Sequence, residues 1–340
     1  MAARANARHR GRCALARSGG RSLPTSLRFC LQALTVMLLA TGAPGCTNDS
    51  RSCACGYDYV VNASIWRSPE GDLFIAGYRG DQTGFVKQLN GGHWEIVHET
   101  PTSLGHIWGT SSSDFFVLGD SSVYRRSQGN WQSWNLSELW RDRTDTTLLG
   151  IWGTLANDLF VVGRQGTVAH FDGTSWKAVE TGSRADLQAV WGTSGTNVLV
   201  VGTGGTILRY DGTGWSTDAS PTSAQLQGIW GSSPKDVFAI AETVSEQSHQ
   251  IVHYDGRAWA TVEEGDKDLL GIRGASSTCV YAVGAKREGS QTTSGVFFYD
   301  GTAWTEKTDN AGEFLWDVWV MPGCDFYAVG PNDTVVHRVP

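Results

Sequence analysis

Short apolar segments and polar turns alternate along this chain in a pattern that recurs about every 40 residues. In the copy around Trp152-Gly153, an apolar run follows at Asp158–Gly163 and an alternating segment at Thr167–Phe171. Such short runs between Gly, Ser and Asp clusters are typical of β-strands. Asp172-Gly173 then predicts a tight turn, because Asp-Gly accepts positive φ. This copy therefore predicts four antiparallel strands, named A to D in chain order, at 149–152, 158–163, 167–171 and 176–179.

The Trp of this Trp-Gly pair, or a substitute for it, marks seven copies and is called the anchor. The spacings between anchors are 42, 44, 39, 39, 43 and 46 residues. A repeat of this length that is rich in short strands predicts one propeller blade per copy. We therefore expect an all-β fold, a seven-bladed β-propeller of four-stranded antiparallel blades. The anchors are Trp66, Trp108, Trp152, Trp191, Trp230, Arg273 and Trp319.

The seventh copy ends at Pro340, directly after its third strand. A propeller that lacks one strand commonly borrows it from the other end of the chain. The segment Arg51–Asp58 has the strand-D spacing before Trp66. We therefore expect an N-terminal strand to close the ring.

Twelve of the 15 Trp occupy two positions of the repeat, and we expect these to pack between blades. A row of aromatic binding cages is the alternative. Trp134, Trp140 and Trp316 lie outside the pattern and are freer to serve another role. An Asp stands six residues after the anchor in five copies. We expect it to bond local backbone and organise a turn, with metal binding as the alternative.

The first 45 residues differ from the rest, with seven Arg, no acidic residue and no copy of the repeat. Their apolar stretch Leu31–Ala40 is too short to span a bilayer, and this arrangement is typical of a secretory signal. Small residues before Cys46 resemble a lipobox, although Ala43 replaces the usual Leu. We predict a lipoprotein signal peptide at 1–45, a lipid on Cys46, a tether at 46–50 and the propeller at 51–340. The protein would then be exported to a bacterial cell envelope, as an outer-membrane lipoprotein or otherwise periplasmic or secreted.

Charge and composition limit the partners. Without residues 1–45, 20 basic and 34 acidic residues remain, a net charge of −14. Such an acidic chain repels phosphate backbones, so nucleic acid is not expected. No later apolar segment approaches 18 residues, so we expect membrane contact only through the lipid. Phosphate-binding loops, dinucleotide fingerprints and calcium loops are missing from the sequence, and no cofactor or metal is predicted.

Four cysteines follow Cys46, and they allow three pairings. Cys279 and Cys324 occupy nearly the same turn of adjacent copies, so we favour a Cys279–Cys324 disulfide. Cys53 and Cys55 offer an alternative scheme that would pin the closing strand, and free thiols are a further alternative.

Length variation is confined to the B–C and D–A connections. In an antiparallel blade these two connections emerge on the same side, which we call the variable-loop face. Binding residues gather on such loops over a rigid scaffold, so we predict the binding site there. Its long loops are 135–147, 242–250 and 286–294. Its candidate residues are Arg79, Asp81, Trp140, Arg141, Arg164, Glu242, His249, Lys286 and Arg287.

The position two residues before the anchor is small in five copies, which lets inner strands approach closely near the axis. His106 and Asp317 break this rule in the second and seventh copies. They are candidates for a polar patch near the central channel, with ordinary packing as the alternative.

The repeat resembles the Trp-rich propeller repeats of bacterial exported lipoproteins. The resemblance covers about residues 51–340 and is carried by segments such as Asp158–Gly163 and Gly205–Trp215. The repeat is also similar, more distantly, to photosystem II assembly factor propellers and to the Asp-box (BNR) repeats of sialidases. The Asp-box residue order and the sialidase arginine triad have no counterpart here, so the resemblance implies fold and export but no activity.

Two functions follow as hypotheses. The first is a non-catalytic, lipid-anchored propeller that binds a protein or glycan partner through its variable-loop face. The second is a glycan-active hydrolase or lyase with a site at the channel mouth, since such sites can be dispersed over several blades.

Overall fold

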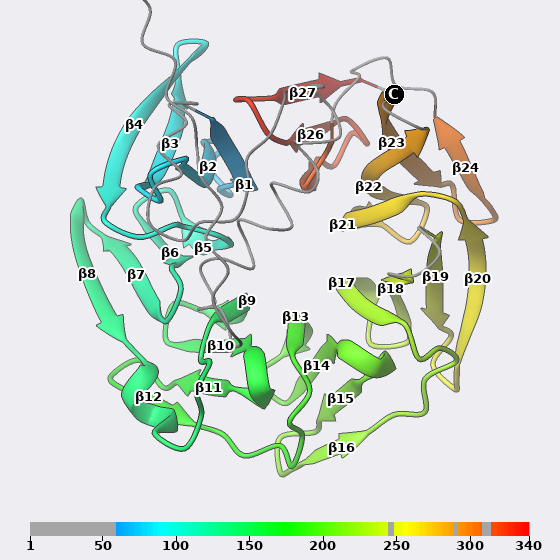
Figure 1. Cartoon of the computed structure of the whole chain (residues 1–340), viewed down its shortest axis with the longest axis horizontal. Coiled ribbons are helices and arrows are strands. Elements are labelled where there is room, and N and C mark those ends of the chain that lie inside the picture. The colour runs from blue at the N-terminus through cyan, green and yellow to red at the C-terminus, as the bar shows by residue number, and fades with distance from the viewer. Residues whose placement is uncertain (1–58, 244–247, 289–290, 308–313, 340) are drawn as a thin grey trace, which may run out of the picture. The chain divides into compact units, whose positions relative to one another are not determined.

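Seven antiparallel sheets form a ring in the computed structural model (Figure 1). It describes residues 59–339 apart from 244–247, 289–290 and 308–313. Within each sheet the strands follow chain order, from the inside of the ring to its rim. The predicted seven-bladed, all-β propeller is confirmed.

Six blades have four described strands each. Blade 1 contains β1 (Val60–Arg67), β2 (Leu73–Arg79), β3 (Gly84–Asn90) and β4 (His93–Thr100). Blade 2 contains β5 (Ile107–Ser111), β6 (Asp114–Leu118), β7 (Ser122–Ser127) and β8 (Asn130–Asn135). Blade 3 contains β9 (Leu148–Leu155), β10 (Asp158–Gly163), β11 (Val168–Phe171) and β12 (Trp176–Ala178). Blade 4 contains β13 (Leu187–Ser194), β14 (Asn197–Gly202), β15 (Ile207–Tyr210) and β16 (Trp215–Thr217). Blade 5 contains β17 (Gln225–Ser233), β18 (Asp236–Thr243), β19 (Ser248–Tyr254) and β20 (Trp259–Gly265). Blade 6 contains β21 (Asp268–Ser276), β22 (Cys279–Glu288), β23 (Gln291–Tyr299) and β24 (Trp304–Lys307).

Blade 7 has three described strands, β25 (Asp317–Val320), β26 (Phe326–Val329) and β27 (Val335–Arg338). The predicted closing strand, 51–58, lies outside the described residues. Three short 3-10 helices, η1 (Ser137–Trp140), η2 (Arg164–Gly166) and η3 (Thr203–Gly205), lie in the connections of blades 2 to 4.

The hydrophobic core is divided among the junctions between blades. Each of seven apolar clusters joins two neighbouring blades; the cluster between blades 4 and 5, for example, includes Trp191, Leu199, Ile229 and Trp259. The predicted packing of anchor Trp between blades is therefore confirmed.

Packing against the neighbouring blade explains why Gly follows the anchor Trp. A Cβ placed on Gly192 would lie 2.7 Å from the Trp152 ring, and one on Gly231 would lie 2.7 Å from the Trp191 ring. Each of these two indoles thus occupies the space over the Gly of the next blade, which only Gly leaves open. The same relation joins Trp108 to Gly153 and Trp230 to Gly274.

The junction between blades 6 and 7 breaks this relation on both sides. Arg273 replaces the indole in blade 6, and Val320 replaces the Gly in blade 7. A disulfide joins Cys279, the first residue of β22, to Cys324 in the A–B turn of blade 7, with 6.0 Å between the Cα atoms. A covalent link therefore stands where the indole packing is missing.

The Asp six residues after the anchor makes contacts other than those predicted. Asp158 accepts hydrogen bonds from Thr154 Oγ1 at 2.5 Å and from His170 Nε2, on the third strand, at 2.7 Å. Asp236 bonds His253 in the same way at 2.7 Å. The expectation of bonds to local backbone is wrong here, because the carboxylate reaches across the sheet to a side chain. The C–D turn does match its prediction, since Gly173 has a φ of +91°.

The long connections predicted in blades 5 and 6 are largely strand. β18 pairs with β19 out to Thr243 and Ser248, and β22 pairs with β23 out to Glu288 and Gln291. The expectation of open loops at 242–250 and 286–294 is therefore wrong. Pairing gives the added backbone groups hydrogen-bond partners, so the additional residues lengthen a hairpin.

Candidate functional site

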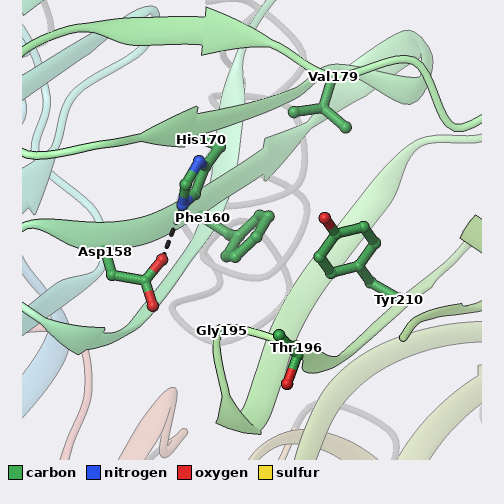
Figure 2. A pocket seen from close by; sticks show the side chains of 7 residues that line it. All are labelled: Asp158, Phe160, His170, Val179, Gly195, Thr196 and Tyr210. Atoms are coloured by element: carbon green, nitrogen blue, oxygen red, sulfur yellow. Dashed lines mark hydrogen bonds and ion pairs between the residues drawn. The ribbon is translucent and has the colours of Figure 1, made fainter. Parts of the chain in front are cut away.

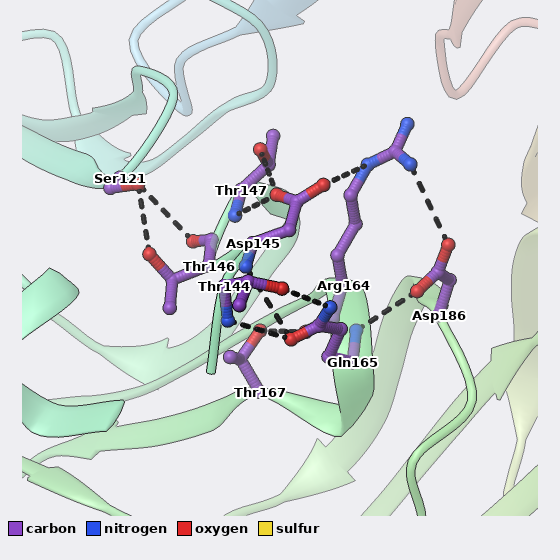
Figure 3. A network of polar contacts seen from close by, with 9 residues as sticks. All are labelled: Ser121, Thr144, Asp145, Thr146, Thr147, Arg164, Gln165, Thr167 and Asp186. Atoms are coloured by element: carbon purple, nitrogen blue, oxygen red, sulfur yellow. Dashed lines mark hydrogen bonds and ion pairs between the residues drawn. The ribbon is translucent and has the colours of Figure 1, made fainter. Parts of the chain in front are cut away.

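A network of polar contacts lies on the variable-loop face where blades 2, 3 and 4 meet (Figure 3). Arg164 begins the B–C connection of blade 3. Its Nε lies 3.7 Å from Asp145 Oδ2 and its Nη1 lies 3.6 Å from Asp186 Oδ2. These two carboxylates belong to the D–A connections on either side of blade 3. One guanidinium therefore ties three connections together.

Gln165 reinforces this arrangement. Its Oε1 accepts the backbone N–H groups of Thr144 at 3.1 Å and Asp145 at 3.4 Å, and its own N–H donates to Asp186 Oδ1 at 2.9 Å. The residue has φ +52°, a region that favours Gly. The equivalent position of blade 4 is Gly204.

The role of Gln165 escaped the sequence analysis, although a signal was present. Arg164-Gln165-Gly166-Thr167 aligns with Thr203-Gly204-Gly205-Thr206, and Gln stands where a left-handed Gly is expected. A non-Gly residue held in this conformation marks a site where the surroundings impose the backbone.

The insertion before blade 3 is packed down onto the scaffold. Trp140 is 2% exposed and lies in the cluster between blades 2 and 3, so its ring is not offered to a partner. The side chain of Arg143 is also 2% exposed and reaches Glu180 at 3.4 Å. Arg141 is exposed and pairs with Glu138 at 3.0 Å. Of the two residues of the insertion that were predicted to bind, Trp140 and Arg141, only Arg141 faces solvent.

Blade 1 contributes Arg79 and Asp81 to the variable-loop face. Arg79 Nη1 lies 2.7 Å from Glu99 Oε1. Asp81 Oδ1 accepts the Thr83 N–H at 2.9 Å, and this bond holds the pKa of Asp81 below its usual value. Both side chains remain accessible at the end of β2.

Blade 5 contributes Glu242 and His249, which differ in exposure. Glu242 accepts a hydrogen bond from Gln227 Nε2. His249 is 1% exposed, and its Nδ1 lies 3.0 Å from the carbonyl oxygen of Lys267. Burial lowers the pKa of His249. His249 therefore supports the hairpin from within, as Trp140 supports the insertion.

The remaining predicted residues are in blade 6. Lys286 and Arg287 lie in β22, in the part of the hairpin beyond the end of the shorter blades. Their side chains fall outside the described part of the structure. The predicted set is thus spread over blades 1, 3, 5 and 6 and the insertion, and it forms a broad surface instead of one cluster.

Two channel candidates have separate roles. Asp317 is 7% exposed; its Oδ2 accepts Ser64 Oγ at 2.8 Å and the Ile65 N–H at 3.1 Å, and its Oδ1 accepts the Val318 N–H at 2.9 Å. This carboxylate therefore joins blade 7 to blade 1.

His106 is exposed and stands directly before β5, the inner strand of blade 2. Desolvation lowers its pKa, with the Asp317 carboxylate opposing this effect and Arg273 adding to it. The charges of Asp317 and Arg273 thus both act on His106, and Asp317 is already engaged as a structural link.

A carboxylate missed by the sequence analysis lies beside the Figure 3 network. Desolvation raises the pKa of Asp120, and the neighbouring Asp145 carboxylate raises it further.

Within the described ranges no helix has the length and apolar character to cross a bilayer.

Comparison with known proteins identifies the fold. No protein-family model matches the chain, and no curated protein matches it. YCF48 from Cyanidioschyzon merolae is similar, with a TM-score of 0.61 and 15% identity over 84% of this chain and 97% of that one. A structure of YCF48 bound to D1 peptide has a TM-score of 0.60 and 12% identity over 84% and 95%. Streptogramin B lyase has a TM-score of 0.63 and 13% identity over 83% and 94%.

At these identities the similarity shows the propeller fold alone. The resemblance to photosystem II assembly factor propellers, read from the repeat, is confirmed at the level of fold.

Proposed function

We propose that this chain is a non-catalytic, exported propeller, lipid-anchored at Cys46, which binds a protein partner through its variable-loop face. The observation that carries the proposal is the contrast between the two faces. A–B and C–D turns have constant length, whereas added residues occur only in B–C and D–A connections, and these are ordered by contacts such as those of Arg164 and Gln165.

Pre-ordered connections favour binding, because less conformational entropy is lost when a partner docks. Arg79, Asp81 and Arg141 add accessible charges to this face. That a similar propeller, YCF48, has been solved with a D1 peptide supports a protein as the partner. A glycan partner is the alternative outcome of the test.

The test shortens the two long hairpins. Replacing 242–250 and 286–294 with the Gly-Thr-Gly-Gly connection of 202–205 removes the largest variable features and leaves the blades in place. Partners are captured by cross-linking on intact cells and identified by mass spectrometry, and the same proteins are applied to a glycan array. We expect one or more proteins to be captured by the native chain and lost from the shortened one.

The matched control replaces the C–D turns 172–175 of blade 3 and 300–303 of blade 6, on the opposite face, with the Asn-Gly-Gly-His turn of 90–93. It should retain all captured proteins. Identical sets of captured proteins from the native and shortened chains would contradict the proposal, and array binding without protein capture would favour a glycan.

One observation favours a second function, a glycan-active enzyme. Asp120 and Asp145 are neighbouring carboxylates, desolvation and Asp145 raise the pKa of Asp120, and glycoside hydrolysis uses a pair of carboxyl groups of which one has a raised pKa. Incubation with a panel of polysaccharides, followed by reducing-end analysis, tests this function. Cleavage that is abolished by Asp120→Asn would support it, and no cleavage by the native chain would exclude these substrates.

A further inference from the structure

A cavity of about 320 Å³ lies between blades 3 and 4, on the face of the A–B and C–D turns (Figure 2). Asp158, Phe160 and His170 of blade 3 form one side. Thr196 and Tyr210 of blade 4 form the other. The cavity therefore combines a carboxylate with aromatic rings on the face opposite the variable loops.

The Asp158 carboxylate has acceptor capacity to spare. Its two oxygens accept one hydrogen bond each, from His170 and from Thr154, and a carboxylate accepts about four. Across the described residues, no Lys or Arg pairs with it. Its side chain is 29% exposed, so the carboxylate is reached from solvent.

Blade 2 shows what such a carboxylate can hold. Arg125 on β7 pairs with Phe116 on β6, and His170 on β11 pairs with Phe160 on β10 in the same way. Arg125 Nε and Nη2 lie 2.8 Å from the two oxygens of Asp114, and its guanidinium carbon lies 5.0 Å from the Phe116 ring centroid. The Asp–aromatic pair of the repeat is thus compatible with a guanidinium.

In blade 3 the corresponding residue is shorter, and the neighbouring turn is open. A Cβ on Gly195 would lie 2.3 Å from Asp158 Oδ2. In blade 5 the equivalent pair is Asp236 and His253, but the facing turn residue is Ser277 instead of Gly. Gly195 therefore approaches the carboxylate of Asp158 closely, and a side chain at this position would cover the carboxylate.

We infer that this cavity is a binding site for a cationic side chain, an Arg or Lys of a protein partner. The Asp158 carboxylate would accept the N–H groups, and the rings of Phe160 and Tyr210 would contact the cation and its alkyl stem. The acidic balance of the chain, 34 Asp and Glu against 27 Lys and Arg, also favours cationic partners. This site goes beyond the proposed function, because it lies on the other face and would serve as a second contact.

The experiment titrates the full chain with N-acetyl-arginine-N-methylamide, followed by ligand-observed NMR. The neutral citrulline analogue is the control ligand. We expect the arginine probe to bind at about 20 mM or below and the citrulline analogue to bind about tenfold more weakly, because a charge-assisted contact is lost.

Three variants locate the site, and each is expected to weaken probe binding about tenfold. Asp158→Asn removes the charge, and Gly195→Ala covers the carboxylate. His170→Arg supplies an internal guanidinium as in blade 2 and fills the cavity. Asp236→Asn is the matched control in the equivalent Asp–His pair of blade 5, and it should leave binding unchanged.

Thermal unfolding confirms that each variant folds, and His170→Arg covers the case in which Asp158→Asn does not. Absence of probe binding to the native chain, equal binding of the citrulline analogue, or an equal loss in Asp236→Asn would overturn the inference. Methyl pyranosides are titrated in parallel, and binding of a sugar without binding of arginine would also overturn it.

Discussion

The junction between blades 4 and 5 and the junction between blades 7 and 1 hold neighbouring blades together by different means. Between blades 4 and 5, the Trp191 ring lies over Gly231 in a cluster of eleven buried apolar residues. Between blades 7 and 1, the described cluster has five, and Arg67 stands where Gly stands in blade 5. Polar contacts supplement the smaller cluster, chiefly those of Asp317 with Ser64 and Ile65.

The difference shows that repeated and unique junctions solve different problems. A junction between neighbouring copies is formed by segments close in sequence and needs only shape complementarity. The junction that closes the ring joins residues more than 250 positions apart, such as Ser64 and Asp317. Directional hydrogen bonds there select one register, whereas apolar packing alone is non-directional.

The largest effect is expected from Trp191→Ala, which removes the indole from an ordinary junction. Loss of a buried Trp side chain lowers the free energy of unfolding by about 4 kcal/mol. Urea unfolding at neutral pH measures it, with Trp191→Phe as a milder control. A loss below about 1 kcal/mol would show that the indole is not central to this junction.

The next effect concerns the junction between blades 6 and 7, where the disulfide replaces indole packing. The double substitution Cys279→Ser and Cys324→Ser should lower the free energy of unfolding by about 3 kcal/mol, within the usual range for a disulfide. Unfolding of the native chain under reducing conditions is the control and should match the double variant. A reduced native chain as stable as the oxidised one would contradict this role.

A smaller effect, about 2 kcal/mol, is expected from Asp317→Ala at the closing junction, because two buried donors of blade 1 lose their acceptor. Hydrogen exchange should then show faster exchange of the Ile65 amide than of inner-strand amides in blade 4. Ser64→Ala combined with Asp317→Ala should cost less than the sum of the single changes. Additive losses would show that the hydroxyl and the carboxylate do not act together.

The smallest effect on stability is expected from the C–D turns. These turns occur in blades 1 to 6 and not in the described part of blade 7. Bonds from Thr213 and Gly214 lower the pKa of Asp211 to about 2. The unfolded value is about 3.9. The stabilisation is therefore complete above about pH 4 and is lost as the pH falls towards 2. The stability difference between the native chain and Asp211→Ala should shrink over this range; a difference independent of pH would contradict the assignment.

The repeat made most of the scaffold predictable. The strand predicted at 158–163 is observed as β10 with the same bounds, because its apolar run lies between clear turn residues. The packing of Trp152 and Trp191 was also predictable, since one residue type recurs at a fixed position.

The functional face was less predictable, because its contacts join residues far apart in sequence. Trp140 was expected to be available for binding, but its burial depends on how the insertion folds back on blade 3. The Asp158–His170 pair required the register between β10 and β11, which neither residue reveals alone. The space beside this pair depends also on Gly195, which belongs to blade 4.

The contact between the indole of one blade and the Gly of the next has a direction. Blades 3, 4 and 5 each contribute an indole to the junction with the next blade and a Gly to the junction with the preceding blade. The three blades therefore have equivalent borders. Duplication or loss of one such repeat would preserve the fit at both new borders. Blades 6 and 7 differ, because Arg273 and Val320 replace the indole and the Gly at their border and a disulfide joins the two blades. We therefore expect the ring to gain or lose repeats among blades 3, 4 and 5. New chain ends for a circular permutation are best placed away from the border of blades 6 and 7.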